Sequence, residues 1–336
     1  MDKCILVTGG CGFIGSNFIR HMLAAYPYRV INLDKLTYAG NPENLQDIEK
    51  DSRYMFIKGD IAETSDLAKA FEMPVGMIVN FAAESHVDRS IIDPGAFVRT
   101  NINGTFQLLE TAKKKGVERF VQISTDEVYG SLGKEGKFRE DTPLSPNSPY
   151  SASKTSADML AMSYYKTYGM PVLITRCSNN YGPYQFPEKL IPLMITNALH
   201  DIELPVYGDG LNIRDWIHVK DHCEAIDVVL HKGIPGNVYN IGGENERTNI
   251  EIVKTILKAL GKPETLIKYV KDRPGHDRRY AIDSTKLKRE LGFSPKTDFT
   301  AGMEDTVKWY KDNRTWWERI KSGAYMEYYK SMYGNR

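Results

Sequence analysis

A tyrosine and a lysine four residues apart, Tyr150 and Lys154, form the pair in this chain that is best suited to proton transfer. Residues at positions i and i+4 share one face of a helix, so the ammonium can lie near the phenol oxygen and favour its ionised form. A helix is expected here because Ser148 provides a cap, Pro149 suits the first turn and Gly169 ends the pattern. Such a pair is also common on helix surfaces, but its setting favours a proton acceptor.

Two adjacent carboxylates, Asp126 and Glu127, follow a predicted strand at residues 120–124. Like charges in a poorly hydrated cleft push their pKa values apart, which suits one group for a general acid and the other for a general base. A solvated turn is the plainer interpretation. Because ligands of open α/β sheets bind at the carboxyl ends of the strands, we favour a catalytic one. Redox chemistry alone would not require this pair.

The N-terminal segment has the pattern of a dinucleotide site. An apolar strand at residues 3–8 leads into a glycine-rich turn at residues 9–15, and an amphipathic helical segment follows. Such a turn lets backbone approach a pyrophosphate, and the helix N-terminus offers unpaired N–H groups to the anion. A second strand at residues 29–33 ends in Asp34, where a carboxylate meets the ribose hydroxyls. The pattern favours NAD over NADP, although the neighbouring Lys35 could accept a 2'-phosphate.

The composition is that of an ordinary globular enzyme. The chain has 336 residues, of which 41% are hydrophobic and 26% charged, so it can bury a large core in two unequal lobes. A net charge of +1, without a basic run containing aromatics, argues against nucleic-acid binding. No apolar stretch reaches the roughly 18 residues that span a bilayer, and the first strand begins too early for a removable signal. We therefore expect no membrane contact and a cytoplasmic location.

The cysteines and histidines predict neither disulfides nor a metal site. The four cysteines show no CxxC or paired spacing, which fits a reducing compartment. His218 and His222 flank Asp221, but a third metal ligand is not apparent. His86 follows a predicted strand and is interpreted as a hydrogen-bonded structural residue.

Strand-like and helix-like segments alternate along the chain, which predicts a parallel sheet with right-handed crossovers. Further strands are expected at residues 54–58, 77–81, 120–124 and 172–175, and helices at residues 102–115 and 150–168. After Cys177 the sequence becomes rich in loop residues, which suggests a lobe boundary. The predicted α/β architecture is a Rossmann doubly wound sheet over residues 1–177 and a smaller, mainly nucleotide-sugar-binding lobe over residues 178–336, with segments free to cross between them.

Taken together, these motifs resemble the extended short-chain dehydrogenase/reductase family, whose members act on nucleotide sugars. The glycine turn with Tyr150 and Lys154 carries the general resemblance. More narrowly, four segments resemble the branch of the family that dehydrates dTDP-glucose, namely residues 34–41, 82–90, 124–130 and 176–185. Cys11, where the family often has alanine, and the tail after Trp317 depart from the pattern. The resemblance covers nearly the whole chain.

The resemblance implies an NAD-dependent lyase that removes water from dTDP-glucose. Tyr150, held by Lys154, takes the proton of the C4 hydroxyl while hydride leaves C4 for the nicotinamide. Glu127 then removes the C5 proton, and Asp126 protonates the departing C6 hydroxyl. Hydride returns to C6, which gives dTDP-4-keto-6-deoxyglucose and regenerates NAD. Thr125 is expected to hydrogen-bond near the C4 oxygen.

The resemblance also implies binding residues and a homodimer. The residues expected at the cofactor, besides Tyr150 and Lys154, are Gly9, Gly12, Phe13, Ile14, Gly15, Asp34, Lys35, Leu36, Thr37, Asp60, Ile61, Ala82, Ala83, Thr100 and Asn180. Those expected at the substrate, besides Thr125, are Ser85, Asn179, Lys189, Leu190, Pro205, Tyr207, Arg214, Asn249, Arg273 and His276. Arg214 and Arg273 are suited to bidentate contact with the diphosphate. The helices at residues 102–115 and 150–168, apolar on more than one face, would join two copies.

Other functions fit parts of the pattern. A UDP-sugar 4-epimerase needs the tyrosine and lysine but no acid-base pair at residues 126–127. GDP-mannose 4,6-dehydratases and UDP-glucuronate decarboxylases keep the glutamate but usually lack the preceding aspartate. A non-catalytic NAD-binding protein would keep the glycine turn and Asp34 alone. The complete set favours the dehydratase, while strictness for thymidine and the deoxysugar pathway, rhamnose or another, stay open.

Overall fold

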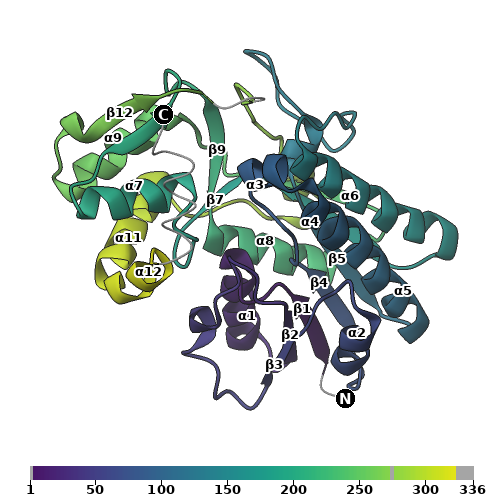
Figure 1. Ribbon diagram of the computed structural model, residues 1–336. Coiled ribbons are helices and arrows are strands. Elements are labelled where there is room, and N and C mark those ends of the chain that lie inside the picture. The colour runs from purple at the N-terminus through teal and green to yellow at the C-terminus, as the bar shows by residue number, and fades with distance from the viewer. Residues whose placement is uncertain (1–2, 273–275, 323–336) are drawn as a thin grey trace.

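The computed structural model describes residues 3–272 and 276–322, which build a large parallel sheet and a smaller lobe beside it (Figure 1). The large sheet contains β1 (Cys4–Thr8), β2 (Arg29–Asp34), β3 (Tyr54–Lys58), β4 (Met77–Asn80), β5 (Arg119–Thr125), β6 (Val172–Cys177) and β10 (Val238–Ile241). All are parallel, in the order β10-β6-β5-β4-β1-β2-β3. The chain starts in the middle of the sheet and winds outwards in both directions, which confirms the predicted doubly wound Rossmann architecture.

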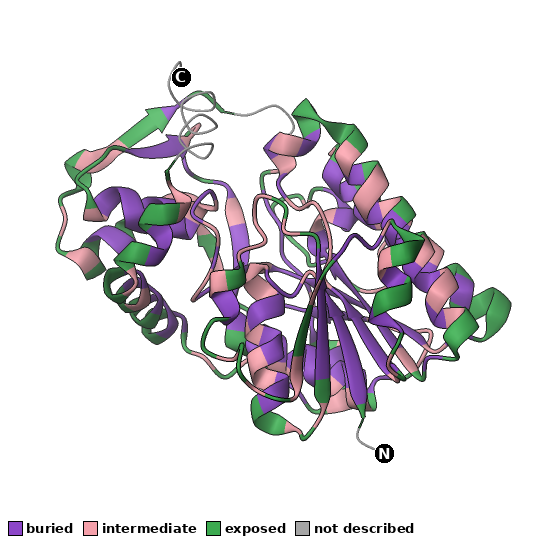
Figure 2. Cartoon of the chain, turned by 60° about the horizontal axis from the view of Figure 1, so that its bottom comes forward, coloured by how far each residue is buried: buried purple, intermediate pink, exposed green. Residues whose placement is uncertain are grey.

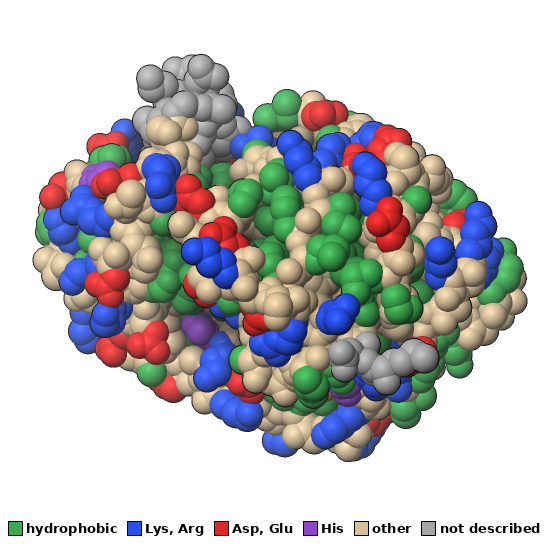
Figure 3. Space-filling model, turned by 90° about the horizontal axis from the view of Figure 1, so that it is seen from below, with side chains coloured by type: hydrophobic (Ala, Val, Ile, Leu, Met, Phe, Trp, Pro, Cys, Tyr) green, Lys and Arg blue, Asp and Glu red, His purple; other side chains and the backbone are tan. Residues whose placement is uncertain are grey.

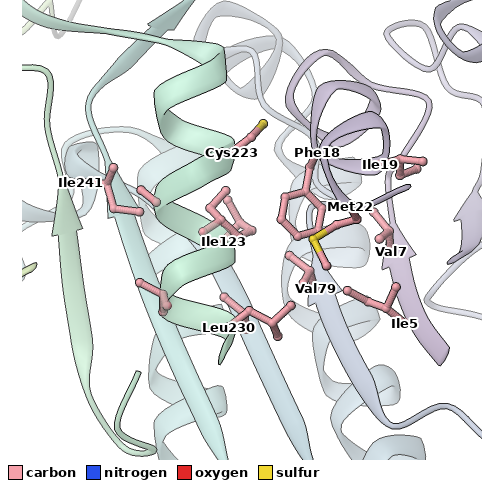
Figure 4. Close-up of a cluster of buried hydrophobic side chains, with 14 of the residues drawn as sticks. Ile5, Val7, Phe18, Ile19, Met22, Val79, Ile123, Cys223, Leu230 and Ile241 are labelled. Atoms are coloured by element: carbon pink, nitrogen blue, oxygen red, sulfur yellow. The ribbon is translucent and has the colours of Figure 1, made fainter. Parts of the chain in front are cut away.

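Helices cover both faces of this sheet because its strands are apolar along most of their length. One face packs against α1 (Phe13–Ala25) and α8 (Val219–Lys232), and the other against α2 (Thr64–Ala70), α5 (Thr105–Lys115) and α6 (Pro149–Tyr168). Figure 2 shows most of the strands buried between these layers, while the edge strand β3 is more exposed. In the core on the first face, Phe18 of α1 and Leu230 of α8 lie against Val79 of β4 (Figure 4). Burial on both sides fixes the carboxyl ends of the strands, where a ligand can bind.

Several short helices complete the larger lobe. They are α3 (Val87–Ile92), α4 (Pro94–Phe97), the π-helix η2 (Val98–Gly104), and the 3-10 helices η1 (Pro42–Leu45) and η3 (Asp126–Tyr129). The helix expected over residues 102–115 is therefore α5 with the end of η2. Helix α6 starts as predicted, because the hydroxyl of Ser148 accepts a hydrogen bond from the backbone N–H of Ser151, and it ends at Gly169 with a φ of 67°.

The smaller lobe has its own strands, helices and core. Its elements are β7 (Asn179–Tyr181), β8 (Leu204–Tyr207), β9 (Ile213–His218), β11 (Glu246–Thr248), β12 (Ile267–Val270), α7 (Leu190–Leu199), α9 (Asn249–Leu260), η4 (Glu264–Leu266), α11 (Phe299–Asp312) and α12 (Arg314–Ile320). Three strands pair in the order β11-β9-β7, and β8 pairs with β12. Helix α8 and strand β10 return to the large sheet, where α10 (Thr285–Leu291) contacts β10. Segments thus cross between the lobes, and a boundary at residue 177 stays a prediction.

Over the described residues, no helix combines the length and apolar character needed to cross a membrane. The face seen in Figure 3 intersperses acidic and basic side chains. This mixture agrees with the net charge of +1.

Candidate active site

A cleft of about 340 Å³ lies at the carboxyl ends of the sheet strands and extends to the smaller lobe. This volume is in the range of small-molecule sites. Five predicted catalytic residues line it together: Thr125, Asp126, Glu127, Tyr150 and Lys154. The residues predicted at the cofactor that line its wall are Gly9, Gly12, Phe13, Ile14, Gly15, Asp34, Lys35, Thr37, Asp60, Ile61, Ala82, Ala83, Thr100 and Asn180. One continuous cleft therefore holds both sets.

The glycine turn between β1 and α1 is shaped by close backbone approach. A Cβ on Gly9, which has a φ of 68°, would come within 2.7 Å of the backbone of Ala82. A Cβ on Gly15 would lie 2.5 Å from the carbonyl oxygen of Gly9. Gly12 is the N-cap residue of α1 and, lacking a side chain, makes no capping hydrogen bond to the first turn. The first turn of α1 thus offers backbone N–H groups to the cleft, and this arrangement fits a dinucleotide pyrophosphate.

Asp34 anchors the segment that follows β2. Its Oδ2 accepts a 2.8 Å hydrogen bond from the N–H of Cys11, and its Oδ1 accepts one of 2.8 Å from the N–H of Leu36. Burial raises the pKa of Asp34, and these two donors oppose the shift. Leu36 itself lies outside the cleft lining and packs against the core, with a φ of 58°. Its place is therefore to shape the turn around Asp34.

The charge of Lys35 is balanced by Asp60. Lys35 Nζ lies 2.9 Å from Asp60 Oδ2, and Arg99 Nη1 lies 2.5 Å from the same oxygen. Burial raises the pKa of Asp60. Hydrogen bonds from the N–H of Ala62 and from the two cations lower it by a larger amount, so the pKa falls below its usual value. A cation tied in this way is less available to a 2'-phosphate, which agrees with the predicted preference for NAD.

Lys154 and Tyr150 lie in the first turns of α6. Lys154 is 5% exposed and donates a 2.6 Å hydrogen bond to the carbonyl oxygen of Ile123 in β5. Burial lowers the pKa of Lys154, and the negative charge of Asp158 opposes this shift. Burial also raises the pKa of Tyr150 well above its usual value, with Glu127 as the second cause. The phenol is therefore protonated at rest and needs a nearby cation to stabilise its anion.

Asp126 and Glu127 occupy the first turn of η3, directly after β5. The hydroxyl of Thr125 accepts a 3.2 Å hydrogen bond from the N–H of Glu127 and caps this turn. Asp126 is 2% exposed, and its Oδ2 has no hydrogen-bond partner among the described residues. Burial and the charge of Glu127 raise its pKa well above the usual value. Glu127 is only partly buried. The two neighbouring carboxyl groups therefore differ in burial, as expected for a general acid beside a general base.

The predicted substrate residues fall into two groups. Ser85, Asn179, Lys189 and Leu190 line the cleft, and Lys189 Nζ donates a 3.1 Å hydrogen bond to the carbonyl oxygen of Ser85. The others in the described part of the chain lie in the smaller lobe outside the lining, namely Pro205, Tyr207, Arg214, Asn249 and His276.

Of the two arginines predicted at the diphosphate, only Arg214 can be placed. Arg214 donates hydrogen bonds to the carbonyl oxygens of Ile213 and Asp277 at 2.7 and 2.8 Å. Arg273 lies outside the described residues. Contact of either arginine with a diphosphate therefore stays a prediction.

Sequence reasoning missed several residues of the cleft, of which Glu188 stands out. Glu188 is buried, Oε2 lies 3.3 Å from Nε of Arg89, and burial raises its pKa. Cys177 and Trp216 also line the cleft. Glu188 directly precedes Lys189, which was predicted at the substrate. This neighbour in the sequence was the one signal that could have indicated Glu188 as a cleft residue.

Two histidines near the cleft, His86 and His222, are buried. His222 Nδ1 lies 2.8 Å from Asn180 Oδ1, and burial lowers the pKa of His222 to about 3, which keeps it neutral. His86 is buried with Nε2 4.0 Å from Glu188 Oε1. The part of the chain that the structure describes contains no group of three His, Cys, Asp or Glu side chains able to hold a metal ion.

Comparison with known proteins identifies close relatives along nearly the whole chain. The family model described as GDP-mannose 4,6 dehydratase matches residues 6–306. A dTDP-glucose 4,6-dehydratase of Xanthomonas campestris pv. campestris (strain B100) is 52% identical over 339 residues, covering 95% of this chain and 96% of the relative. The dTDP-glucose 4,6-dehydratase of Bacillus anthracis str. Ames, solved in complex with NAD, is 57% identical with a TM-score of 0.89, covering 95% of this chain and 100% of that one. A Streptomyces venezuelae enzyme of the same name, also solved with NAD, is 51% identical with a TM-score of 0.93 at the same coverage.

Proposed function

Because the chain belongs to the GDP-mannose 4,6-dehydratase family, we propose that it is an NAD-dependent lyase that converts dTDP-glucose to dTDP-4-keto-6-deoxyglucose and water. The observation that carries this proposal is one cleft containing both a Tyr150–Lys154 pair and an Asp126–Glu127 pair. A 4-epimerase needs only the first pair. Relatives about half identical over nearly the full chain support the same substrate.

The residues of the glycine turn and of β2 would hold NAD. The N-terminus of α1 faces the pyrophosphate, and Asp34 meets the adenosine ribose. NAD, when bound, takes up the hydride of C4 and later delivers it to C6. The overall reaction is redox-neutral for this reason, and no second redox substrate is required.

Tyr150, Lys154 and Thr125 carry out the proton transfer at C4. Tyr150 accepts the proton of the C4 hydroxyl as the carbonyl forms, and the Lys154 ammonium stabilises the developing phenolate. The hydroxyl of Thr125 holds the C4 oxygen in line with this transfer. The 4-ketone that results makes the C5 hydrogen acidic.

Glu127 and Asp126 carry out the elimination. Glu127 removes the C5 proton as a general base, and the C6 hydroxyl leaves as water with the proton of Asp126. Once hydride has reached C6, a proton returns to C5. Burial and the charge of Glu127 raise the pKa of Asp126, which favours its protonated form, as a general acid requires.

The assembly and location are also proposed. Phe106 of α5 and Met159, Tyr165 and Tyr168 of α6 are exposed apolar side chains on adjacent helices. A four-helix contact with a second copy would bury them, which supports a homodimer; sedimentation at several protein concentrations tests it. The four free cysteines are all buried, which suits the reducing cytoplasm.

The test is incubation of purified protein with dTDP-glucose, without added NAD, followed by mass spectrometry of the sugar nucleotide. We expect loss of one water, abolished by Tyr150→Phe and slowed by about a hundredfold or more in Glu127→Gln. Tyr164→Phe, on the same helix and hydrogen-bonded to Glu110, is the matched control and should leave the rate unchanged. An unchanged mass with inversion at C4 would show an epimerase. No reaction with dTDP-, UDP- or GDP-sugars would leave only NAD binding.

A further inference from the structure

A buried ion pair lies directly behind the catalytic lysine. Asp158 follows Lys154 by one turn of α6 and is fully buried. Its Oδ2 accepts a 2.9 Å hydrogen bond from Nε of Arg176 in β6, whose side chain is 4% exposed. An ion pair that is so deeply buried gives up its hydration and is weak evidence for stability. Its position suggests a different role.

Arg176 also contacts η3, the turn that carries the proposed acid and base. Its Nη1 donates a 3.0 Å hydrogen bond to the hydroxyl of Tyr129, and the guanidinium lies 4.9 Å from the centre of that ring. The Tyr129 hydroxyl in turn donates a 2.8 Å hydrogen bond to Asn240 Oδ1 in β10. Tyr129 is the last residue of η3, whose first two residues are Asp126 and Glu127. The contacts therefore run from α6 through β6 to η3.

We propose that Asp158, Arg176 and Tyr129 form a brace that fixes the helix bearing Tyr150 and Lys154 against the turn bearing Asp126 and Glu127. The brace residues are positioning residues for the proposed dehydration, on which this inference rests. The first pair acts at C4 and the second at C5 and C6, so both must meet neighbouring atoms of one sugar. Catalysis is sensitive to displacements of about 1 Å, which can change a rate by about a hundredfold.

The brace is rigid for identifiable reasons. In the parallel pairing of β6 with β5, Arg176 lies opposite Ser124, the residue before Thr125. Its planar guanidinium is satisfied on one edge by a carboxylate and on another by a phenol oxygen, which fixes its orientation. Both partners are themselves buried. A displacement of η3 relative to α6 would leave buried polar atoms unpaired, so the brace resists it.

The variant Tyr129→Phe tests the brace by removing one hydroxyl and keeping the ring. We expect C4 oxidation to continue while elimination slows, so that the 4-ketone still carrying its C6 hydroxyl accumulates. Rapid quenching and mass spectrometry measure the ratio of this ketone to the final product, which should rise by about tenfold or more over the wild-type ratio. This ratio depends on turnover of bound substrate and not on the fraction of folded protein, so destabilisation alone does not change it.

Two further variants complete the experiment. Tyr164→Phe removes the hydroxyl that donates to Glu110 from the same helix, outside the brace, and should keep the wild-type ratio. Asp158→Asn should raise the ratio in the same direction as Tyr129→Phe. A wild-type ratio in Tyr129→Phe, whatever its overall rate, overturns the brace alone. If the wild-type protein removes no water from dTDP-glucose, the proposed function fails and the brace fails with it.

Discussion

Lys154 Nζ donates a 2.6 Å hydrogen bond to the carbonyl oxygen of Ile123, two residues before Thr125 on the same strand. This contact ties helix α6 to the end of β5, where Thr125 is the last residue and Asp126 and Glu127 follow. The ammonium is thereby held in the wall of the cleft. We expect its charge to act on the phenol of Tyr150, four residues earlier on the same helix.

Replacement of Lys154 by methionine should remove the stabilisation of the Tyr150 anion while keeping a side chain of similar length. We expect kcat to fall by about a hundredfold to ten-thousandfold, with the KM for dTDP-glucose changed much less. Steady-state kinetics measure both. A variant with near-normal kcat would show that the lysine charge is not used.

The pKa of Asp126 predicts a characteristic pH dependence of stability. Burial raises this pKa in the folded state, so the folded protein holds a proton that the unfolded chain releases above its ordinary pKa near 3.9. The free energy of unfolding should therefore fall, relative to Asp126→Asn, as the pH rises from the ordinary pKa through the raised one. Urea unfolding at acid and neutral pH measures the free energy of unfolding of both proteins. Between these two pH values we expect the wild type to lose about 1 kcal/mol or more relative to Asp126→Asn. Parallel curves at every pH would contradict a raised pKa.

Asp158→Asn should also move the alkaline limb of the kcat profile. The groups that act on Lys154 are Asp158 on α6, Cys177 on β6 and the Ile123 carbonyl on β5, while the two carboxyl groups of η3 act on Tyr150. Loss of the Asp158 charge lowers the pKa of Lys154 further, so the ammonium is lost at a lower pH. We expect the limb to move down by about one pH unit. The same limb in both proteins would exclude this coupling.

The glycine turn can be tested with two alanine substitutions. Gly15→Ala places a Cβ where only 2.5 Å separates it from the carbonyl oxygen of Gly9, so the turn must open. We expect the protein to be purified with little NAD, measured by release on denaturation. Gly133→Ala adds a Cβ with no neighbour within 4 Å and should keep the wild-type NAD content. Equal NAD content in both variants would mean that this turn does not hold the pyrophosphate.

Local patterns predicted much of the sheet and its cleft. The strand-turn-helix at the N-terminus and the helix carrying Tyr150 are specified by short-range signals, namely apolar runs, glycines and the Ser148 cap, and the structure contains both. Their relative positions follow from the parallel sheet, which brings strand ends to one edge. This is why the Tyr150–Lys154 and Asp126–Glu127 pairs could be expected in one cleft.

Long-range pairing could not be read from the sequence in the same way. Strand β10 joins the sheet beside β6 after the chain has passed through the smaller lobe, and no local pattern specifies that partner. Arg176 contacts residues 18 and 47 positions away, Asp158 and Tyr129. Each of these side chains is unremarkable in isolation, so the brace emerges only from the fold.

The fate of the C4 hydrogen tests the proposed dehydration most directly. The protein is incubated with dTDP-glucose carrying deuterium at C4, without added NAD, and the product is examined by NMR. We expect the deuterium on C6 of dTDP-4-keto-6-deoxyglucose, because hydride leaves C4 and returns within the same cleft. Deuterium retained at C4, or product whose C6 carries hydrogen from solvent instead, would contradict the proposed dehydration.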